Sequence, residues 1–240
     1  MRDLSRIGEV SNARLSLGRD TGGLPTRELQ RFRLDHAAAR QAVWTPLDVE
    51  ALRSALPAVP VQVVASAAET RESYLRRPDL GRRLAPGSAI EPAPADVAIV
   101  VGDGLSSLAV SRQVPELLGE LLPRLGGYSL APLTIATNAR VALGDEIGAG
   151  VGARCVIMLI GERPGLSSPE SLGAYLTFAP TVGLPDSRRN CISNIHEHGL
   201  SHADAAERIA GLVREMFGQQ TSGVGLVAPA QAIIADPQRP

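Results

Sequence analysis

Cys155-Val-Ile-Met-Leu-Ile-Gly-Glu162-Arg-Pro-Gly-Leu166 is the segment that most clearly indicates how this chain folds. An apolar run rich in long aliphatic residues is followed at once by a glycine, two charged residues, a proline and a second glycine. Such a run, bounded by turn residues, is typical of a strand buried on both faces of a sheet. In open α/β sheets, ligands bind at the carboxyl ends of the strands. The segment therefore predicts a buried strand followed by a ligand-binding loop at Gly161, Glu162 and Arg163.

Strand and helix patterns alternate on both sides of this segment. Apolar runs predict strands at 97–101 and 133–136, and Val61–Val64 is a short extended candidate. Apolar residues at helical spacing predict helices over 26–44, 47–56, 69–75, 105–122 with a break or kink at Pro115, 141–151, and 202–217 with Ser201 as its cap. Ser167–Glu170 resembles a helix start, and 186–195 a polar loop. The alternation predicts βαβ units and a mainly parallel sheet.

A change of composition divides the chain. Residues 85–95 contain Pro86, Gly87, Pro92 and Pro94 and are the best candidate for a linker. The sequence therefore predicts an α/β fold in two parts. A helical N-terminal region, 1–93, precedes a Rossmann-like domain, 94–240, with a mainly parallel sheet flanked by helices.

The composition excludes several classes of protein. The chain has 240 residues, 44% of them hydrophobic and 20% charged, as in ordinary globular proteins. A formal net charge of −1 argues against general binding to nucleic acid, which needs a basic excess. No apolar run approaches the roughly 20 residues that span a bilayer, and the N-terminus lacks an apolar signal core. We therefore expect a cytoplasmic protein with two reduced cysteines that binds neither nucleic acid nor membranes.

The turn Gly102-Asp103-Gly104 is one candidate site outside the 155–166 segment. It follows a predicted strand and opens a predicted helix, as a nucleotide-binding turn does. Ser107 stands where the fingerprint has its third glycine, so the motif is incomplete. A stand-alone nucleotide-binding module and a plain βα turn capped by Asp103 or Ser106 both remain open.

The second candidate is a group of metal-ligating residue types, Cys191, His196, His198 and His202. Their spacing is not a standard zinc pattern, which favours a His-rich polar loop over a metal site. Cys191 as a nucleophile paired with one of the histidines is a further alternative. His36 lies on the apolar side of its predicted helix and is expected to pack there. Glu162 and Arg163 could also simply pair with each other.

Five segments in order resemble the small subunit of ethanolamine ammonia-lyase. They are Phe32–His36 with Ala39-Arg40, Tyr74–Gly81, Asp103–Ser106, Leu159–Leu166 and Asn190–Ile195. The likeness extends from about residue 19 to residue 217. It implies an adenosylcobalamin-dependent lyase that converts ethanolamine to acetaldehyde and ammonia by a radical mechanism. In that family a large TIM-barrel subunit holds the substrate, and the small subunit encloses the corrinoid at the interface of a hetero-oligomer.

The resemblance also assigns residues. The family's cofactor contacts match Val141, Glu162 and Cys191 in this chain. It implies that the catalytic groups lie on the large subunit, so that this chain is active only in the complex. No catalytic and no metal-binding residue is assigned to this chain. Residence in a bacterial microcompartment varies with the organism. Arg163 receives no role from the resemblance.

Overall fold

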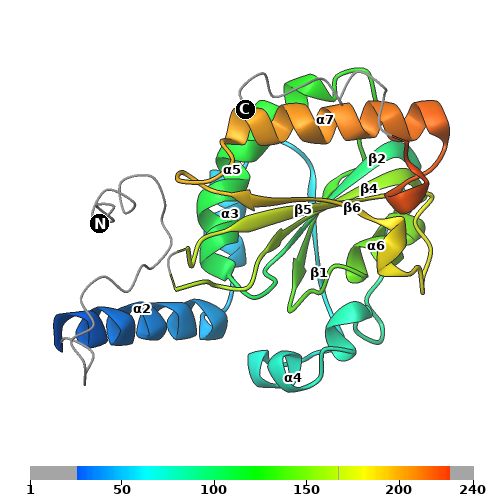
Figure 1. Cartoon of the computed structure of the whole chain (residues 1–240). Coiled ribbons are helices and arrows are strands. Elements are labelled where there is room, and N and C mark those ends of the chain that lie inside the picture. Colours follow the sequence, from blue (N-terminus) through cyan, green and yellow to red (C-terminus); the bar gives the residue numbers. More distant parts are fainter. Residues whose placement is uncertain (1–25, 167, 228–240) are drawn as a thin grey trace, which may run out of the picture.

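A computed structural model describes residues 26–166 and 168–227 of the chain. Within these residues the strands form one six-stranded sheet in the order β1-β3-β2-β4-β5-β6 (Figure 1). The four strands that come first in the sequence are parallel, and β5 and β6 continue the sheet in antiparallel pairing. Their bounds are β1 Val61–Ala65, β2 Ala95–Gly102, β3 Leu133–Thr137, β4 Ala153–Gly161, β5 Leu172–Phe178 and β6 Asn190–Ile195.

The parallel half has the winding expected from the sequence. Strand β2 leads through α5 (Ser107–Arg124) to β3, and β3 leads through α6 (Leu143–Val151) to β4. Because β3 and β4 lie on opposite sides of β2, the winding reverses around β2. The predicted α/β fold, with a mostly parallel sheet flanked by helices, is confirmed.

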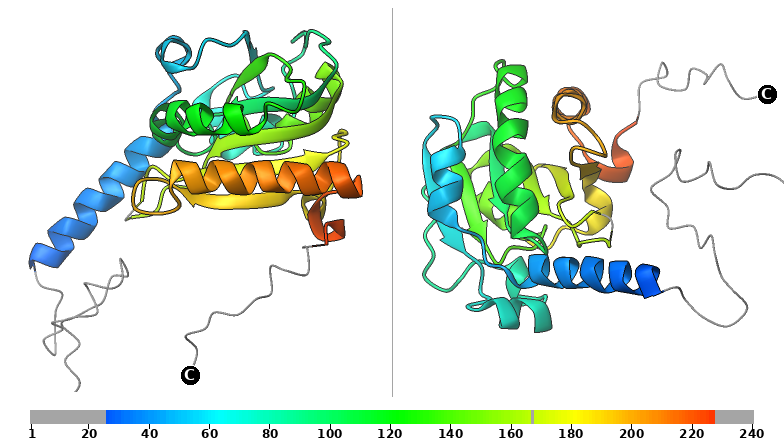
Figure 2. Two further views of the ribbon diagram at one scale, coloured as in Figure 1. Left: turned by 90° about the horizontal axis from the view of Figure 1, so that it is seen from above. Right: turned by 90° about the vertical axis from the view of Figure 1, so that its left-hand side faces the viewer.

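Helices cover both faces of the sheet. Helices α5 and α7 (His202–Gln219) lie side by side on one face, seen from above in Figure 2, with α3 (Val49–Ala55) beside α5. Along β4, Cys155, Ile157 and Leu159 point into this layer, which we call the α5 face. Met158 and Ile160 point to the opposite side, where α6 packs, and this is the α6 face. Strand β4 is therefore buried on both sides, as its unbroken apolar run predicts.

The antiparallel half corrects two predictions. Ser168–Glu170 is a turn that leads into β5 and not the start of a helix, while Ser167 lies outside the described residues. The predicted polar loop at 186–195 is a 3₁₀ turn, Asp186–Arg188, followed by β6. In β6 only Ile192 and Ile195 are buried, because an edge strand leaves the remaining side chains exposed or half-buried. With only two buried apolar residues among polar ones, the segment has a composition similar to that of a loop.

Helix α5 corrects a third detail. It continues through Pro115 and Pro123 as one helix, so the predicted break at Pro115 does not occur. The side chains of α5 on the sheet side are fully buried, among them Leu117, Leu118 and Leu121. Tertiary packing of that face outweighs the local penalty of proline inside a helix.

Helix α2 (Thr26–Trp44) projects from the α/β body (Figures 1 and 2). Its only buried residue is Ala42, and Phe32 is 44% exposed. His36 is exposed and stacks on the Phe32 ring at 6.1 Å, so the prediction that it packs in the interior is wrong. The division of the chain at residue 93 stays a prediction, although β1 contributes an edge strand to the common sheet. Among the described residues, no helix has the length and apolar character required to cross a membrane.

Candidate functional site

Glu162 directly follows β4 and is held by Ser171, just before β5, and by Asn194 of β6. Its backbone N–H donates to the Ser171 carbonyl oxygen at 2.9 Å. Its carboxylate atom Oε2 accepts from Ser171 Oγ at 2.5 Å and from the Asn194 backbone N–H at 3.2 Å. Glu162 therefore bonds to Ser171, the residue before β5, and to Asn194 of β6, and not to the exposed Arg163. The other oxygen, Oε1, takes part in neither of these bonds and lies over Gly173.

Cys191 lies opposite Tyr175 in the β5–β6 register. The thiol and the phenol hydroxyl interact, and Glu162 is close enough to affect the pKa of both groups. Partial burial on the sheet surface raises the pKa of the Cys191 thiol, an effect that the Tyr175 hydrogen bond opposes and Glu162 reinforces. A raised pKa keeps the thiol protonated and disfavours nucleophilic chemistry. The structure thus pairs Cys191 with a tyrosine and not with a histidine.

Val141 lies on the same α6 face, further along the sheet. It stands between β3 and α6 and packs, half-buried, against the apolar cluster beneath α6, as Tyr175 does. Strands β2 and β4 separate β3 from β5, so the axes of β3 and β5 lie three interstrand spacings, or about 14 Å, apart. The structure therefore brings Glu162 and Cys191 together around Tyr175, with Val141 at the far side of the same face.

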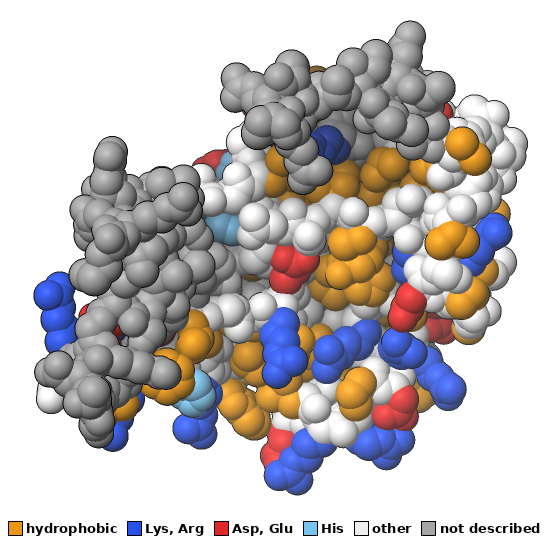
Figure 3. All heavy atoms as spheres, viewed as in Figure 1, with side chains coloured by type: hydrophobic (Ala, Val, Ile, Leu, Met, Phe, Trp, Pro, Cys, Tyr) orange, Lys and Arg blue, Asp and Glu red, His pale blue; other side chains and the backbone are white. Residues whose placement is uncertain are grey.

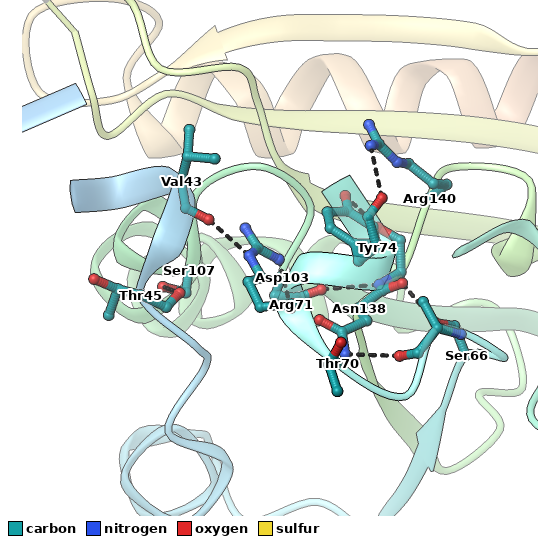
Figure 4. A network of polar contacts seen from close by, with 12 residues as sticks. Val43, Thr45, Ser66, Thr70, Arg71, Tyr74, Asp103, Ser107, Asn138 and Arg140 are labelled. Carbon is teal, nitrogen blue, oxygen red and sulfur yellow. Dashed lines mark hydrogen bonds and ion pairs between the residues drawn. The ribbon is translucent and has the colours of Figure 1, made fainter. Parts of the chain in front are cut away.

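A polar network holds the loop that carries Val141, which we call the 138–141 loop (Figure 4). The buried Asp103 carboxylate accepts from the Ala139 backbone N–H at 2.9 Å and pairs with Arg71 at 3.1 Å. The Tyr74 hydroxyl donates to the Ala139 carbonyl oxygen at 3.1 Å. Asn138, whose φ is +52°, donates through its side chain to the Ala68 carbonyl oxygen at 2.9 Å. The residues around 66–81 therefore fix the position of this loop.

Two guanidinium groups flank the Tyr74 ring in this network. The carbon atoms of the Arg71 and Arg140 guanidinium groups lie 4.7 and 4.3 Å from the ring centroid, within the range of cation–π attraction. Arg71 Nη2 and Arg140 Nε are buried and have no hydrogen-bond partner among the described residues. Burial raises the pKa of Tyr74 to about 12. Burial also raises the pKa of the Asp103 carboxyl, and Arg71 opposes that shift.

Other segments of the same chain pack against the Gly102-Asp103-Gly104 turn and fill the space that a nucleotide would need. A Cβ atom on Gly104, whose φ is +55°, would stand 2.1 Å from the Gly161 carbonyl oxygen. The start of α5 is also covered, because Ser106 Oγ and Ser107 Oγ donate to the carbonyl oxygens of Pro169 and Thr45, both at 2.7 Å. Ser106 caps the helix, as the plain-turn alternative predicts. The glycines thus serve packing between β2 and β4, which argues against the nucleotide-binding alternative.

The histidines near Cys191 bond to other partners. His196 Nε2 lies 2.8 Å from Asn194 Oδ1, and His202 reaches Gln113 and Glu116 on α5. In the part of the chain that the structure describes, no three His, Cys, Asp or Glu side chains are grouped so that they could hold a metal ion.

Sequence reasoning missed the residues that complete the site, Ser171, Tyr175 and Asn194. All three belong to β5, β6 or the turn before them, which the sequence pattern did not identify as strands. Residues 172–178 show no regular alternation of side-chain size or polarity, so the sequence carries no clear strand signal for β5.

Comparisons with known proteins agree with the resemblance found in the sequence. The profile of the family described as ethanolamine ammonia-lyase light chain (EutC) matches residues 2–227. The chain is 51% identical over 224 residues to the ethanolamine ammonia-lyase small subunit of Bradyrhizobium diazoefficiens, covering 89% of this chain and 86% of that protein. It is 50% identical over 235 residues to the small subunit of Rhodopseudomonas palustris, covering 94% and 89%. For that of Rhodococcus erythropolis the identity is 47% over 231 residues, covering 94% and 90%. The chain therefore belongs to the ethanolamine ammonia-lyase light-chain family.

Proposed function

We propose that this chain acts with a large TIM-barrel subunit as an adenosylcobalamin-dependent ethanolamine ammonia-lyase. The complex converts ethanolamine to acetaldehyde and ammonia by a radical mechanism, and this chain contributes its α6 face to the cofactor site at the subunit interface. The observation that carries the proposal is that Glu162, Cys191 and Val141 lie on one face of the sheet. We also propose that the complex works in the cytoplasm, within a microcompartment in organisms that make one.

The chemistry of this face fits a corrinoid. The rim of a corrin ring carries amide groups that donate and accept hydrogen bonds, separated by apolar edges. Glu162 offers an acceptor, the neutral Cys191 thiol a weak donor, and Val141 an apolar contact. Gly173 keeps the surface between β4 and β6 low, because a Cβ atom there would lie 2.9 Å from Glu162 Oε1. A surface that combines polar groups with apolar contact suits the rim of a large ligand of this kind.

The residues of this chain bind, orient and shield; they do not react. When bound, adenosylcobalamin supplies the homolysis of its cobalt–carbon bond, which starts the radical chemistry. The α6 face holds the corrinoid rim and excludes water from it on one side. Within the described residues the face offers no nucleophile beside a base, because Cys191 is paired with Tyr175. We infer that the groups that bind and deprotonate ethanolamine belong to the large subunit.

The purified chain should not turn over ethanolamine when adenosylcobalamin is added. Acetaldehyde production should appear only after the large subunit is supplied, because the substrate site lies there. The assay is a coupled alcohol dehydrogenase measurement of acetaldehyde, with the large subunit alone as the control. Turnover by this chain alone would refute the division of roles, and an inactive, corrinoid-free complex would refute the proposed function.

Glu162→Ala should raise the dissociation constant of adenosylcobalamin in the assembled complex by about 10- to 100-fold, since a hydrogen bond to a charged group contributes roughly 1.5–3 kcal/mol. Equilibrium dialysis followed by corrinoid absorbance measures the constant. Glu207→Ala is the matched control, because Glu207 is an exposed carboxylate of α7 on the other side of the sheet. An unchanged constant for Glu162→Ala would show that this carboxylate only braces β5 and β6.

A further inference from the structure

Tyr175 is the one residue of β5 that reaches the surface. The other six residues of the strand are buried, while Tyr175 is half-buried. The register places it opposite Met158 of β4 and Cys191 of β6, on the α6 face. Its side chain packs against the apolar cluster beneath α6. A phenylalanine would satisfy that packing equally well. The hydroxyl group bonds to the Cys191 thiol, a weak hydrogen-bond partner that the carbonyl oxygen of a ligand can replace as acceptor.

The ring of Tyr175 and the carboxylate predicted to bind the cofactor lie over the same residue, Gly173. A Cβ atom on Gly173 would lie 2.9 Å from Glu162 Oε1 and 3.2 Å from Tyr175 Cε2, so both side chains converge over that glycine. The two hydrogen bonds that Ser171 and Asn194 make to Glu162 use Oε2. The oxygen on the Tyr175 side is therefore the one that can accept from a ligand.

The protonation of this pair suits a neutral amide. Burial raises the pKa of Tyr175 above its ordinary range, and the neighbouring Cys191 and Glu162 add to that effect. The phenol is therefore a proton donor at neutral pH. A phenol donor and a carboxylate acceptor side by side match the carbonyl oxygen and the N–H group of one carboxamide.

We propose that Tyr175 is a further cofactor-contacting residue. Its hydroxyl donates to the carbonyl oxygen of a peripheral carboxamide of the corrinoid, and Glu162 Oε1 accepts from the N–H group of the same carboxamide. This rests on the proposed function. The pair lies on the face that carries Val141 and Cys191. On the side of the molecule drawn in Figure 3, hydrophobic side chains form a patch with an acidic side chain at its edge and basic side chains below it. Such a surface offers apolar contact and polar groups to one ligand.

The test uses the assembled complex and hydroxocobalamin, which has the peripheral amides of the cofactor but no adenosyl group. Equilibrium dialysis gives the dissociation constant without any turnover. Tyr175→Phe should raise it about 3- to 10-fold, the effect of one neutral hydrogen bond. Tyr128→Phe should leave it unchanged, because Tyr128 packs against Phe217 on the α5 face. Gly173→Ala should also raise it, because the added methyl group displaces Glu162 Oε1 and the Tyr175 ring.

A second probe tests which group is recognised. The probes are derivatives of hydroxocobalamin in which one peripheral carboxamide is hydrolysed to a carboxylate. The derivative altered at the ring position that this pair contacts should bind the wild-type complex more weakly than the derivatives altered elsewhere. That discrimination should shrink in Glu162→Ala, since the carboxylate that accepts from the amide N–H and repels a charged derivative is gone, and it should persist in Tyr175→Phe, because a phenol donates to an amide oxygen and to a carboxylate oxygen alike. Gel filtration checks that each variant still assembles with the large subunit.

The outcomes separate the two proposals. An unchanged constant for Tyr175→Phe, with weaker binding by Glu162→Ala, would overturn the role of Tyr175 and leave the proposed function standing. Unchanged constants for both variants would place the corrinoid elsewhere and overturn the role of Tyr175 together with the assignment of this face. A wild-type complex that binds no corrinoid and yields no acetaldehyde would overturn the proposed function itself.

Discussion

Asp145→Ala should lower the free energy of unfolding of the chain by about 3–5 kcal/mol, the usual cost of removing one partner from a buried ion pair. The side chains of Asp145 on α6 and Arg189, just before β6, are only 2% and 3% exposed. Arg189 donates to Asp145 Oδ2 through Nη2 and through Nε, the latter at 3.2 Å, and to the Leu184 carbonyl oxygen at 3.0 Å. Without Asp145 this guanidinium loses its buried counter-charge and keeps only Asp186, whose side chain is 83% exposed. Urea unfolding of the full chain, followed by circular dichroism, measures the change.

Two further variants show whether charge is the cause. Asp145→Leu combined with Arg189→Met should recover most of the lost stability, because apolar side chains of similar size replace a buried pair at little cost. Asp79→Ala should change stability far less, because the Asp79–Arg77 pair is exposed. If the double variant is as unstable as Asp145→Ala, the loss comes from packing and not from an unpaired charge.

Asp103→Ala should lower the melting temperature of the chain by roughly 6–20 °C, which corresponds to a loss of about 3–5 kcal/mol in a domain of this size. In the interior, the Asp103 carboxylate forms an ion pair with the Arg71 guanidinium and accepts a hydrogen bond from the Ala139 backbone N–H. Arg71 in turn donates from Nε to the Val43 carbonyl oxygen near the end of α2, at 2.7 Å. Loss of the carboxylate leaves a buried cation unpaired and frees both the 138–141 loop and the anchor of α2.

Differential scanning calorimetry measures this shift, and limited proteolysis reports on α2. Glu72→Ala is the matched control, since Glu72 lies beside Arg71 on α4 (Arg71–Arg76) but forms an exposed pair with Arg76. It should shift the melting temperature little. Cleavage within α2 should be faster in Asp103→Ala than in Glu72→Ala. Equal cleavage rates would contradict the idea that the Asp103–Arg71 pair anchors α2.

The parallel half of the sheet could be predicted from the sequence because each of its strands and helices has a pattern formed by residues that are close together in the chain. Strands β2 and β4 are buried on both faces, so each reads as an unbroken apolar run that ends in a glycine. The helices between them show their apolar residues at helical spacing, and Ser106 and Ser201 cap α5 and α7 by accepting from backbone N–H groups.

The antiparallel half could not be predicted because its pattern depends on neighbours. The Ser-Pro-Glu segment before β5 carries the signs of a helix start, yet the backbone there pairs with β4 through Glu162 and Ser171. The exposed residues of β6 are polar because the strand lies at the edge of the sheet, and edge position is a tertiary property.

The same distinction applies to the site. The position of Glu162 after a buried strand indicated a ligand loop, whereas Val141 and Cys191 were assigned only by the family resemblance. Neither the residue pattern nor the family resemblance identified Tyr175. Its closeness to Cys191 follows from the β5–β6 register, and its closeness to Glu162 requires Gly173 between them. Neither relation can be inferred from the spacing of these residues along the chain.

The strand order sets a sequence of events for folding. Within residues 26–166 and 168–227, strand β1 pairs only with β3, and paired residues such as Gln62 and Thr134 are 72 positions apart. On a ribosome, β1 therefore emerges long before the strand that will receive it, and loop closure over such a separation slows folding. The β5–β6 hairpin has no such delay, since its strands are near neighbours in the sequence. We expect the β1 edge and the 66–81 segment, which anchors the 138–141 loop, to be acquired late, after β2 and β3 have paired.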